Sequence, residues 1–159
     1  MYVCHYDSPL GSLTMESDGY ALTRLDFDGL YSEHEDKLPV FDETHRWLDI
    51  FFSGNDPGFT PNLDPAGTAF RKAVWRILLT ILFGKTMSYG QIADLISQER
   101  EIPRMSAQAI GGAVGHNPIP IIIPCHRVIG SDGSLTGYSA GLHRKIRLLE
   151  LERNSPWLF

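Results

Sequence analysis

The sequence predicts an α/β protein in two parts. A small N-terminal α/β domain with an antiparallel sheet is expected over residues 1–66, and a mainly helical C-terminal domain with a helix-turn-helix over residues 67–159. Short β-rich segments separated by turn residues fill the first part, whereas helical periodicity dominates the second. The stretch "SGNDPGFTPNLDPAG", which joins them, is rich in Gly, Pro, Asn and Asp and therefore predicts a connecting loop.

The N-terminal part contains three candidate strands and one candidate helix. The strand segments are "YVCHY", "SLTMES" and "YALTRLDF", which are rich in β-branched and aromatic residues. The segments "DSPLG" and "SDG" between them have the composition of tight turns, which favours antiparallel pairing. The following segment "DETHRWLDIFF" predicts a helix.

The C-terminal part has three helical signals before residue 116. One helical face is predicted by the apolar positions Phe70, Val74, Ile77, Leu78 and Ile81. In "SYGQ", Ser88 and Gln91 form a capping-box pattern that opens the helix "YGQIADLI". A second short helix, "SAQAIGGAVGH", is expected to begin near Ser106. Two short helices joined in this way predict a helix-turn-helix.

Two adjacent glycines interrupt the second of these helices. Gly111 and Gly112 each cost about 1 kcal/mol relative to Ala in a helix interior. A helix tolerates that cost where something must approach its backbone closely. Tight packing against another helix of the same chain is an equally good explanation at this point.

Charge is distributed unevenly along the chain, whose net charge is −5. Residues 1–66 hold 3 Lys/Arg against 13 Asp/Glu, a balance of −10, whereas residues 67–159 hold 11 against 6, a balance of +5. A basic C-terminal module could meet phosphates. Alternatively, the opposite charges complement each other where the two domains meet.

Composition indicates an ordinary globular protein without membrane or secretion signals. No apolar run approaches the ~20 residues that cross a bilayer, and "MYVCHYDSPLGS" lacks the basic and apolar regions of a signal peptide. The cysteines Cys4 and Cys125 can form one disulfide at most. We therefore expect a protein of the reducing cytoplasm, with no membrane partner.

Cys125 follows an apolar run, "IPIIIP", that predicts a buried strand with a proline at each end. A free thiol is only a few per cent ionised at neutral pH, so a reactive one needs a base or a positive charge nearby. His126 and Arg127 are candidates, but neighbours on a strand point to opposite faces, so His126 would act through a water or a turn. For a lone cysteine after an apolar run, an inert core residue is the more common case.

The residues around Cys125 favour a reactive thiol over an inert core residue. The motif "PCHRV" follows "HNP", with "SYGQIA" upstream and "TGYSAG" downstream, and this pattern resembles the O6-alkylguanine-DNA alkyltransferases. The resemblance covers nearly the whole chain: "DSPLG" at 7–11, "GTAFRKAVW" at 67–75, "SYGQIA" at 88–93, "AIGGAVGHNPIPIIIPCHRVIG" at 109–130 and "LTGYSAGLHRKIRLLELE" at 135–152. Residues 67–159 would then form the DNA-binding and alkyl-acceptor domain.

The resemblance implies a catalytic group around one acceptor. The Cys125 thiolate would take the alkyl group from guanine O6 by direct displacement, His126 would remove the thiol proton through a water, and Glu152 would orient His126. The resulting thioether has no redox route back, so each molecule acts once. The role of Glu152 has independent support from helical spacing. Around the helix axis, Glu152 falls between Leu148 and Leu149, beside the apolar face formed by Leu142, Ile146 and Leu149. A surface pair with Lys145 or Arg153 is the alternative.

Further residues match positions that the family uses for the substrate. Asn117 matches the hinge between the recognition helix and the active-site strand, and Tyr89 a tyrosine that crowds the target phosphate and bonds to the guanine. The base pocket is expected to include Val114, Val128, Tyr138 and Ser139. DNA contacts are expected from Arg104, Ser106, Gln108, Ala109 and Gly112. The second helix would enter the minor groove, and the nucleotide would flip out of the stack.

Two features depart from common members of the family. Gln108 stands where many members carry an arginine that fills the gap left by the flipped base. Some members also bind zinc in the N-terminal domain, whereas Cys4 and His5 are adjacent here and no ligand quartet is apparent, so we expect no structural zinc. The displacement needs no cofactor.

Two other classes of protein are weighed against this interpretation. Alkyltransferase-like proteins bind damaged DNA without chemistry, but they replace the cysteine that this chain keeps. A cysteine hydrolase or redox enzyme would need a histidine in direct reach of the thiol or a CxxC pair. The expected partner is double-stranded DNA that contains O6-alkylguanine, bound by a monomer without an obligate protein partner.

Overall fold

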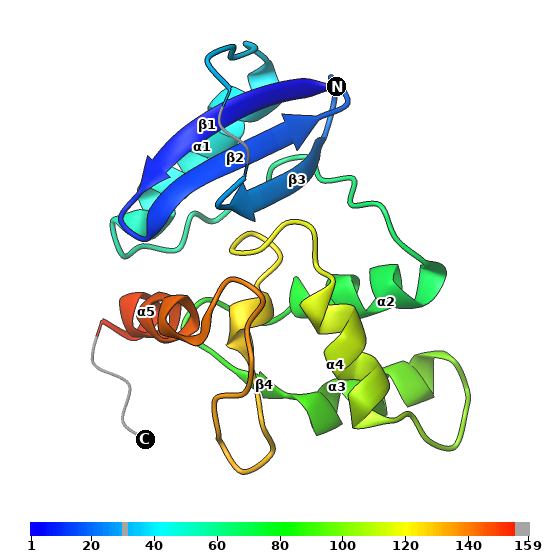
Figure 1. The fold of residues 1–159 in the computed structure, drawn as a ribbon. Coiled ribbons are helices and arrows are strands. Elements are labelled where there is room, and N and C mark those ends of the chain that lie inside the picture. Colours follow the sequence, from blue (N-terminus) through cyan, green and yellow to red (C-terminus); the bar gives the residue numbers. More distant parts are fainter. Residues whose placement is uncertain (30–31, 155–159) are drawn as a thin grey trace. The chain divides into compact units, whose positions relative to one another are not determined.

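The computed structural model describes residues 1–29 and 32–154. The chain divides into two compact units, Met1–Ala66 and Gly67–Phe159 (Figure 1). The first contains a sheet and one helix, and the second contains mainly helices. The prediction of an α/β protein with a small antiparallel sheet and a helical C-terminal part is confirmed.

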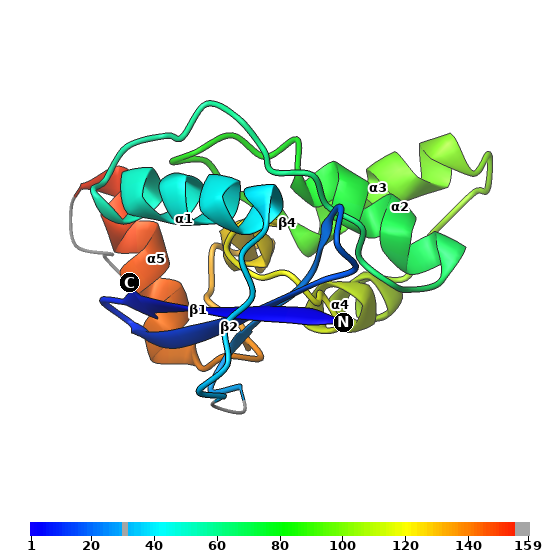
Figure 2. The ribbon, with the colours of Figure 1, turned by 90° about the horizontal axis from the view of Figure 1, so that it is seen from above.

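The first unit is a three-stranded antiparallel sheet covered by a helix on one face. Strands β1 (Tyr2–Ser8), β2 (Gly11–Ser17) and β3 (Leu22–Phe27) pair in that order. Helix α1 (Pro39–Phe52) lies against the sheet, as Figures 1 and 2 show. The side chains buried in this unit come from both layers and include Leu13, Met15, Leu25, Phe41, Leu48 and Phe51.

Local sequence explains these elements. Ser8 pairs directly with Gly11, so only Pro9 and Leu10 form the first turn, and Gly11 has a φ of 128° that suits glycine. Helix α1 starts with Pro39 in its first turn, where a missing amide proton costs nothing. The helix therefore begins three residues earlier than the segment "DETHRWLDIFF" predicted.

In its described residues, 67–154, the second unit has four α-helices and a short parallel strand pair. Its elements are α2 (Ala69–Leu78), β4 (Met87–Ser88), α3 (Tyr89–Glu99), α4 (Ala107–Gly115), the 3-10 helix η1 (Cys125–Arg127), β5 (Val128–Ile129) and α5 (Leu142–Arg153). Strands β4 and β5 pair in parallel, Ser88 opposite Ile129. This pairing brings the start of α3 beside the segment that follows Cys125.

Helices α3 and α4 form the predicted helix-turn-helix. Ser88 and Gln91 make the complete capping box at the start of α3, and the Ser106 hydroxyl accepts a hydrogen bond from the Ala109 amide at the start of α4. Helix α2 packs against both, and the Trp75 indole donates a buried 2.9 Å hydrogen bond to the Ala113 carbonyl. The connection, residues 100–106, is longer than the usual 3–4-residue turn.

Three local predictions were wrong. Helix α2 ends at Leu78, so Ile81 lies in the turn that follows. Residues 118–124 are buried turns rather than a strand, because prolines at both ends and a φ of 75° at Ile121 prevent extended pairing. On α5, Leu142 is 44% exposed, and the buried residues are Lys145, Leu148, Leu149 and Glu152.

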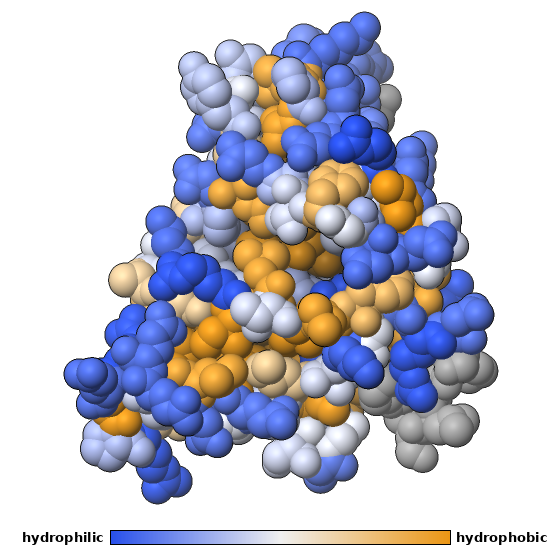
Figure 3. Space-filling model, turned by 180° about the vertical axis from the view of Figure 1, so that it is seen from behind, coloured by the Kyte–Doolittle hydropathy of each residue, from blue (hydrophilic) through white to orange (hydrophobic). Residues whose placement is uncertain are grey.

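The surface mixes hydrophilic and hydrophobic side chains on the face drawn in Figure 3. Exposed large apolar residues of the second unit include Leu79, Leu82 and Leu95. In the described residues, 1–29 and 32–154, no helix is both long and apolar enough to cross a bilayer.

Candidate active site and nucleic-acid interface

The turns before Cys125 are held by a network around Asn117. The Asn117 side-chain amide donates to the Ile123 carbonyl at 2.7 Å, and its oxygen accepts from the Ile119 amide at 3.0 Å. Asn117 follows the end of α4, so these bonds tie the helix to the segment that carries the cysteine. Cys125 then opens η1, with only 4% of the residue exposed.

The environment of the thiol keeps it protonated at rest. Burial raises the pKa of Cys125, while hydrogen bonding from Asn117 and Tyr138 and the positive charge of Lys145 act in the opposite direction without cancelling it. These groups, rather than the sequence neighbours His126 and Arg127, are the ones that favour the thiolate. A base is therefore needed to remove the proton during any reaction of this thiol.

His126 has the properties of that base. It is fully buried and its Nε2 lies 2.5 Å from the Glu152 carboxylate. A carboxylate only accepts, so Nε2 carries the proton and Nδ1 is the basic nitrogen of the neutral ring. Burial is the main cause that lowers the pKa of His126, opposed by Glu152, so the imidazole is neutral near pH 7. Because η1 is a helical turn, the strand argument about opposite faces does not apply.

Glu152 is buried and accepts from three partners. Besides His126, these are the Arg127 guanidinium, at 2.7 Å and 3.1 Å to the two oxygens, and the Gly84 amide at 2.9 Å. Burial would raise the pKa of Glu152, but His126 and Arg127 together outweigh it and lower the pKa. The carboxylate is thus held ionised. Glu152 is therefore buried and paired with His126 and Arg127, and it is not the surface residue that the alternative pairing with Lys145 or Arg153 assumed.

Arg127 binds the Glu152 carboxylate rather than the Cys125 thiol. Its guanidinium also donates to the Ile81 carbonyl at 2.6 Å and lies over the Phe83 ring. Five fixed N–H groups let one arginine fasten the loop after α2 and the end of α5 together. The positive charge expected beside the cysteine is therefore supplied by another residue.

That residue is Lys145, which the sequence reasoning missed. It lies on α5, is 1% exposed, and donates to the carbonyls of Val128 at 2.5 Å and Thr136 at 3.1 Å. A signal was available, because Lys145 stands three residues before Leu148 and four before Leu149, on the same face as Glu152.

The predicted pocket residues come from several segments, α3, α4, β5 and the loop before α5. Val114 and Val128 are buried, whereas Ser139 is exposed. The Tyr138 hydroxyl is buried and has no hydrogen-bond partner of ordinary geometry in the described part of the chain; it interacts with the Cys125 thiol. At the first position of α3, the Tyr89 hydroxyl accepts from Thr136 at 3.3 Å.

The exposed face of α4 consists of small and polar residues. Gln108, Ala109 and Gly112 are exposed, as are Arg104 and Ser106 in the preceding turn. A Cβ added at Gly112 would meet nothing within 4 Å, and one at Gly111 would make only an ordinary 3.9 Å contact with Tyr89. Packing within the chain therefore does not explain the two glycines, and they leave backbone open to an outside partner.

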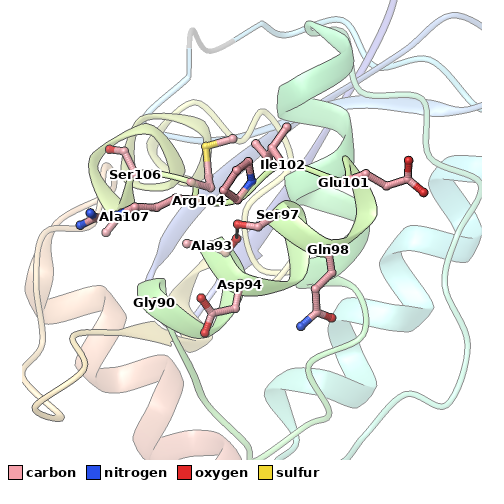
Figure 4. Close-up of a pocket in the computed structure, with 12 residues that line it drawn as sticks. Gly90, Ala93, Asp94, Ser97, Gln98, Glu101, Ile102, Arg104, Ser106 and Ala107 are labelled. Atoms are coloured by element: carbon pink, nitrogen blue, oxygen red, sulfur yellow. Dashed lines mark hydrogen bonds between the residues drawn. The ribbon is translucent and has the colours of Figure 1, made fainter.

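A cavity of about 560 Å³ lies beside the helix-turn-helix, away from Cys125. Figure 4 shows the residues that line it, among them Asp94, Ser97 and Gln98 on α3 and Arg104 and Ser106 in the turn. With Asp94 and Glu101 against Arg104, its charge does not favour a phosphate. The cavity therefore does not offer a site for an anion.

Both cysteines are free thiols, and Cys4 lies in the first unit with its sulfur 3.5 Å from His45 Nε2. Across residues 1–29 and 32–154, no three His, Cys, Asp or Glu side chains gather in a group that could hold a metal ion.

Fold and site together define a class: a small α/β unit followed by a helix-turn-helix unit that carries a buried cysteine with a histidine–glutamate pair. Comparison with known families agrees. Residues 69–154 match the model described as "6-O-methylguanine DNA methyltransferase, DNA binding domain", and residues 1–65 match its "ribonuclease-like domain". The chain belongs to the family of methylated-DNA–protein-cysteine methyltransferases.

Individual relatives show the same extent of similarity. A methylated-DNA–protein-cysteine methyltransferase of Haemophilus influenzae is 40% identical, covering 96% of this chain and 87% of its own. One from Mycobacterium tuberculosis is 43% identical over 94% of this chain and 93% of its own. The crystal structure of Mycobacterium tuberculosis OGT in complex with DNA has a TM-score of 0.83 at 44% identity, covering 98% of this chain and 96% of that one.

Proposed function

We propose that this protein repairs O6-alkylguanine in double-stranded DNA by transferring the alkyl group irreversibly to Cys125, once per molecule. The observation that carries the proposal is a buried thiol held beside a neutral histidine whose other nitrogen bonds to a buried, ionised carboxylate. Membership of the family supplies the substrate class.

The transfer is a displacement at the alkyl carbon. The Cys125 sulfur forms a bond to that carbon, the carbon–O6 bond breaks, and its electron pair leaves with the guanine. The thiol proton passes to His126, and the departing base gains one proton, so the products are a thioether and an ordinary guanine. A soft sulfur nucleophile and a stable leaving group make a cofactor unnecessary. No redox step can return the thioether to a thiol.

His126 takes the proton at Nδ1 through a bound water, while Glu152 fixes the ring and balances the positive charge that forms on it. The raised pKa of Cys125 is the reason that this relay is needed. The polar groups of Asn117 and Tyr138 lower the pKa of the Cys125 thiol and so favour the developing thiolate. The contacts of the Glu152 carboxylate, at 2.5 Å to His126 and 2.7 Å to Arg127, support this relay.

The second unit binds the DNA. Helix α4 enters the minor groove with its open glycine backbone, and Arg104, Ser106, Gln108 and Ala109 contact the duplex around it. A buried thiol reaches a guanine O6 substituent only if the nucleotide leaves the stack, at a cost of a few kcal/mol. Tyr89, Val114, Val128, Tyr138 and Ser139 then receive the base. The protein acts as a cytoplasmic monomer in this proposal.

Mass spectrometry tests the proposal directly. After incubation with a duplex that contains O6-methylguanine, the intact protein should gain one methyl group, located on the peptide that contains Cys125. One equivalent of protein should repair one equivalent of lesion. Tight binding to the duplex with no gain in mass would place the protein among non-catalytic damage binders and overturn the proposal.

The substitution Cys125→Ser should abolish transfer and preserve binding to the duplex. A hydroxyl has a far higher pKa than a thiol, so the His126 relay cannot ionise it. Cys4→Ser is the matched control, because Cys4 is also a buried free thiol but lies in the first unit. Methyl transfer by Cys125→Ser at a rate near that of the native protein would contradict the mechanism.

A further inference from the structure

The connection between α2 and β4 reaches the Glu152 carboxylate through its backbone. The Gly84 amide donates to Glu152 Oε1 at 2.9 Å, and the Ile81 carbonyl accepts from the Arg127 guanidinium at 2.6 Å. Arg127 is itself bound to Glu152. Residues 81–84 therefore contact both the buried carboxylate and the cation that is paired with it.

The donors around Glu152 are divided between its two oxygens. Oε1 accepts from the Gly84 amide at 2.9 Å and from Arg127 Nε at 2.7 Å. Oε2 accepts from His126 Nε2 at 2.5 Å and, at the longer distance of 3.1 Å, from Arg127 Nε. A glutamate carboxylate otherwise rotates easily about the bond that joins it to its side chain. Two donors on Oε1 fix that rotation, and the fixed rotation directs Oε2 at His126.

The conformation of Gly84 is what points its amide at the carboxylate. Its φ is 79°, in the left-handed region that most residues avoid. Space is not the restriction, because Gly84 is exposed and an added Cβ would meet only the Glu152 carbonyl among the described residues, at an ordinary 3.5 Å. The glycine is therefore explained by the direction of its backbone and not by packing.

A backbone amide also holds the carboxylate without adding a further positive charge. This matters for His126, because the charges of Arg127 and Lys145 already lower its pKa, in addition to the larger effect of burial. A third cation beside Glu152 would make the imidazole a still weaker base. A neutral donor fixes Oε1 and leaves the basicity of His126 nearly unchanged.

We propose that Gly84 is a positioning residue for alkyl transfer: its amide, directed by the positive φ of the turn at residues 81–84, fixes Oε1 of Glu152 so that Oε2 stays aimed at His126. This inference rests on the proposed function, in which His126 is the base. Gly84 acts through Glu152 and His126 and not on the substrate itself.

Three substitutions test the role of this amide. Gly84→Pro removes the donor and the positive φ together, since proline has no N–H and a φ near −65°. Gly84→Asn keeps the N–H, and asparagine tolerates the left-handed region better than most residues. Gly58→Pro is the matched control, because Gly58 has a φ of 76° and donates its amide to the Asp56 carboxylate at 3.1 Å, but lies in the first unit.

Single-turnover transfer from methylated duplex at pH 7 should be about 10–100-fold slower in Gly84→Pro, as when the hydrogen-bond partner behind a metal-binding side chain is removed. The deficit should shrink towards pH 9, where the Cys125 thiol, whose pKa is raised, begins to ionise without help. Gly84→Asn should stay near the native rate. Gly58→Pro should keep the native rate even if its melting temperature falls.

A double-substitution cycle separates positioning from general loss of stability. In a His126→Ala background, Gly84→Pro should slow transfer hardly any further, because residues that act as one unit are not additive. Circular dichroism confirms that each variant is folded. A folded Gly84→Pro with the native rate and pH profile would overturn the inference, and so would full additivity with His126→Ala.

A second measurement needs no DNA and covers a Gly84→Pro variant that fails to fold. The proton on His126 Nε2 is observed by NMR in the native protein, in Gly84→Ala and in Gly58→Ala. A short bond to a carboxylate moves this resonance downfield, so it should move upfield in Gly84→Ala and stay in place in Gly58→Ala. An unmoved resonance in Gly84→Ala would contradict the inference. If it moves but native protein transfers no methyl group from DNA, the proposed function fails and the positioning of Glu152 by Gly84 stands.

Discussion

At the scale of single residues, the site depends on which charges are compensated. Glu152 is stabilised as a carboxylate by His126, Arg127 and Gly84, and His126 is kept neutral by burial. Removing one partner of such a buried group typically costs about 3–5 kcal/mol. Arg127 therefore matters for the stability of the site although it does not interact with the sulfur.

The pH dependence of the relay follows from these pKa directions. His126→Ala and Glu152→Gln should each slow transfer at pH 7 by about 10²–10⁴-fold, the usual contribution of general-base catalysis. Since the pKa of Cys125 is raised, the native thiol is protonated at pH 7, and raising the pH ionises it without help. The deficit of both variants should therefore shrink towards pH 9.

Single-turnover rates on methylated duplex from pH 6 to pH 9 measure that effect. His116→Ala is a suitable control, because His116 is an exposed histidine at the end of α4. A deficit of constant size across the whole range would indicate that His126 and Glu152 only maintain the structure of the site.

At the scale of elements, the two glycines of α4 lower the stability of the helix and leave its backbone open. Gly112→Ala should raise the free energy of unfolding by about 1 kcal/mol, because alanine is the better helix former and the added methyl meets nothing within 4 Å. The same methyl should weaken binding to duplex DNA. Chemical denaturation and fluorescence anisotropy measure the two effects, with Gly90→Ala in α3 as the control. Stability gained without loss of DNA affinity would show that α4 does not approach the duplex through Gly112.

Gln108 on the exposed face of α4 gives a second prediction for this element. If this side chain fills the gap left by the flipped base, Gln108→Arg should accelerate repair of duplex DNA, by about fivefold for each kcal/mol gained, because arginine is longer and charged. The reaction with free O6-benzylguanine, which needs no flipping, should hardly change.

Second-order rates with both substrates decide between the possibilities. Arg104 lies in the turn just before α4 and is exposed, so Arg104→Gln tests whether it already supplies the positive charge. Equal acceleration with duplex and free base, or no gain on the duplex, would exclude a role for Gln108 in flipping.

At the scale of the whole molecule, binding to DNA should reflect the charge of one unit rather than the net charge of −5. Residues 67–159 hold 11 Lys/Arg against 6 Asp/Glu, although the chain as a whole is acidic. Affinity should fall steeply with salt, with a slope of about −0.9 for each phosphate contact in a plot of log affinity against log salt.

Arg104→Gln should reduce that slope by about one unit, since it removes one expected phosphate contact. Arg46→Gln, in the acidic first unit, should leave the slope unchanged. The salt slopes of the variants can be measured by fluorescence anisotropy at salt concentrations from about 50 to 200 mM. A slope that responds equally to both substitutions would mean that the whole molecule, and not the second unit, sets the DNA affinity.

The sequence by itself determined the elements and the acceptor group. Strand composition, turn residues and helical spacing are local properties, so β1–β3, α1, the capping box of α3 and the start of α4 were predicted to within a few residues. The motif "PCHRV" and the helical spacing of Glu152 pointed to Cys125, His126 and Glu152, and the last two lie in contact.

Only the tertiary structure decided which groups surround each charge. Arg127, two residues after the cysteine in sequence, binds Glu152, whereas Lys145, twenty residues after the cysteine, acts on the thiol. The same applies to the apolar run before Cys125, which prolines and the Asn117 network fold into turns instead of a strand. Burial and electrostatic pairing depend on which segments meet in space, and spacing along one helix or strand does not contain that information.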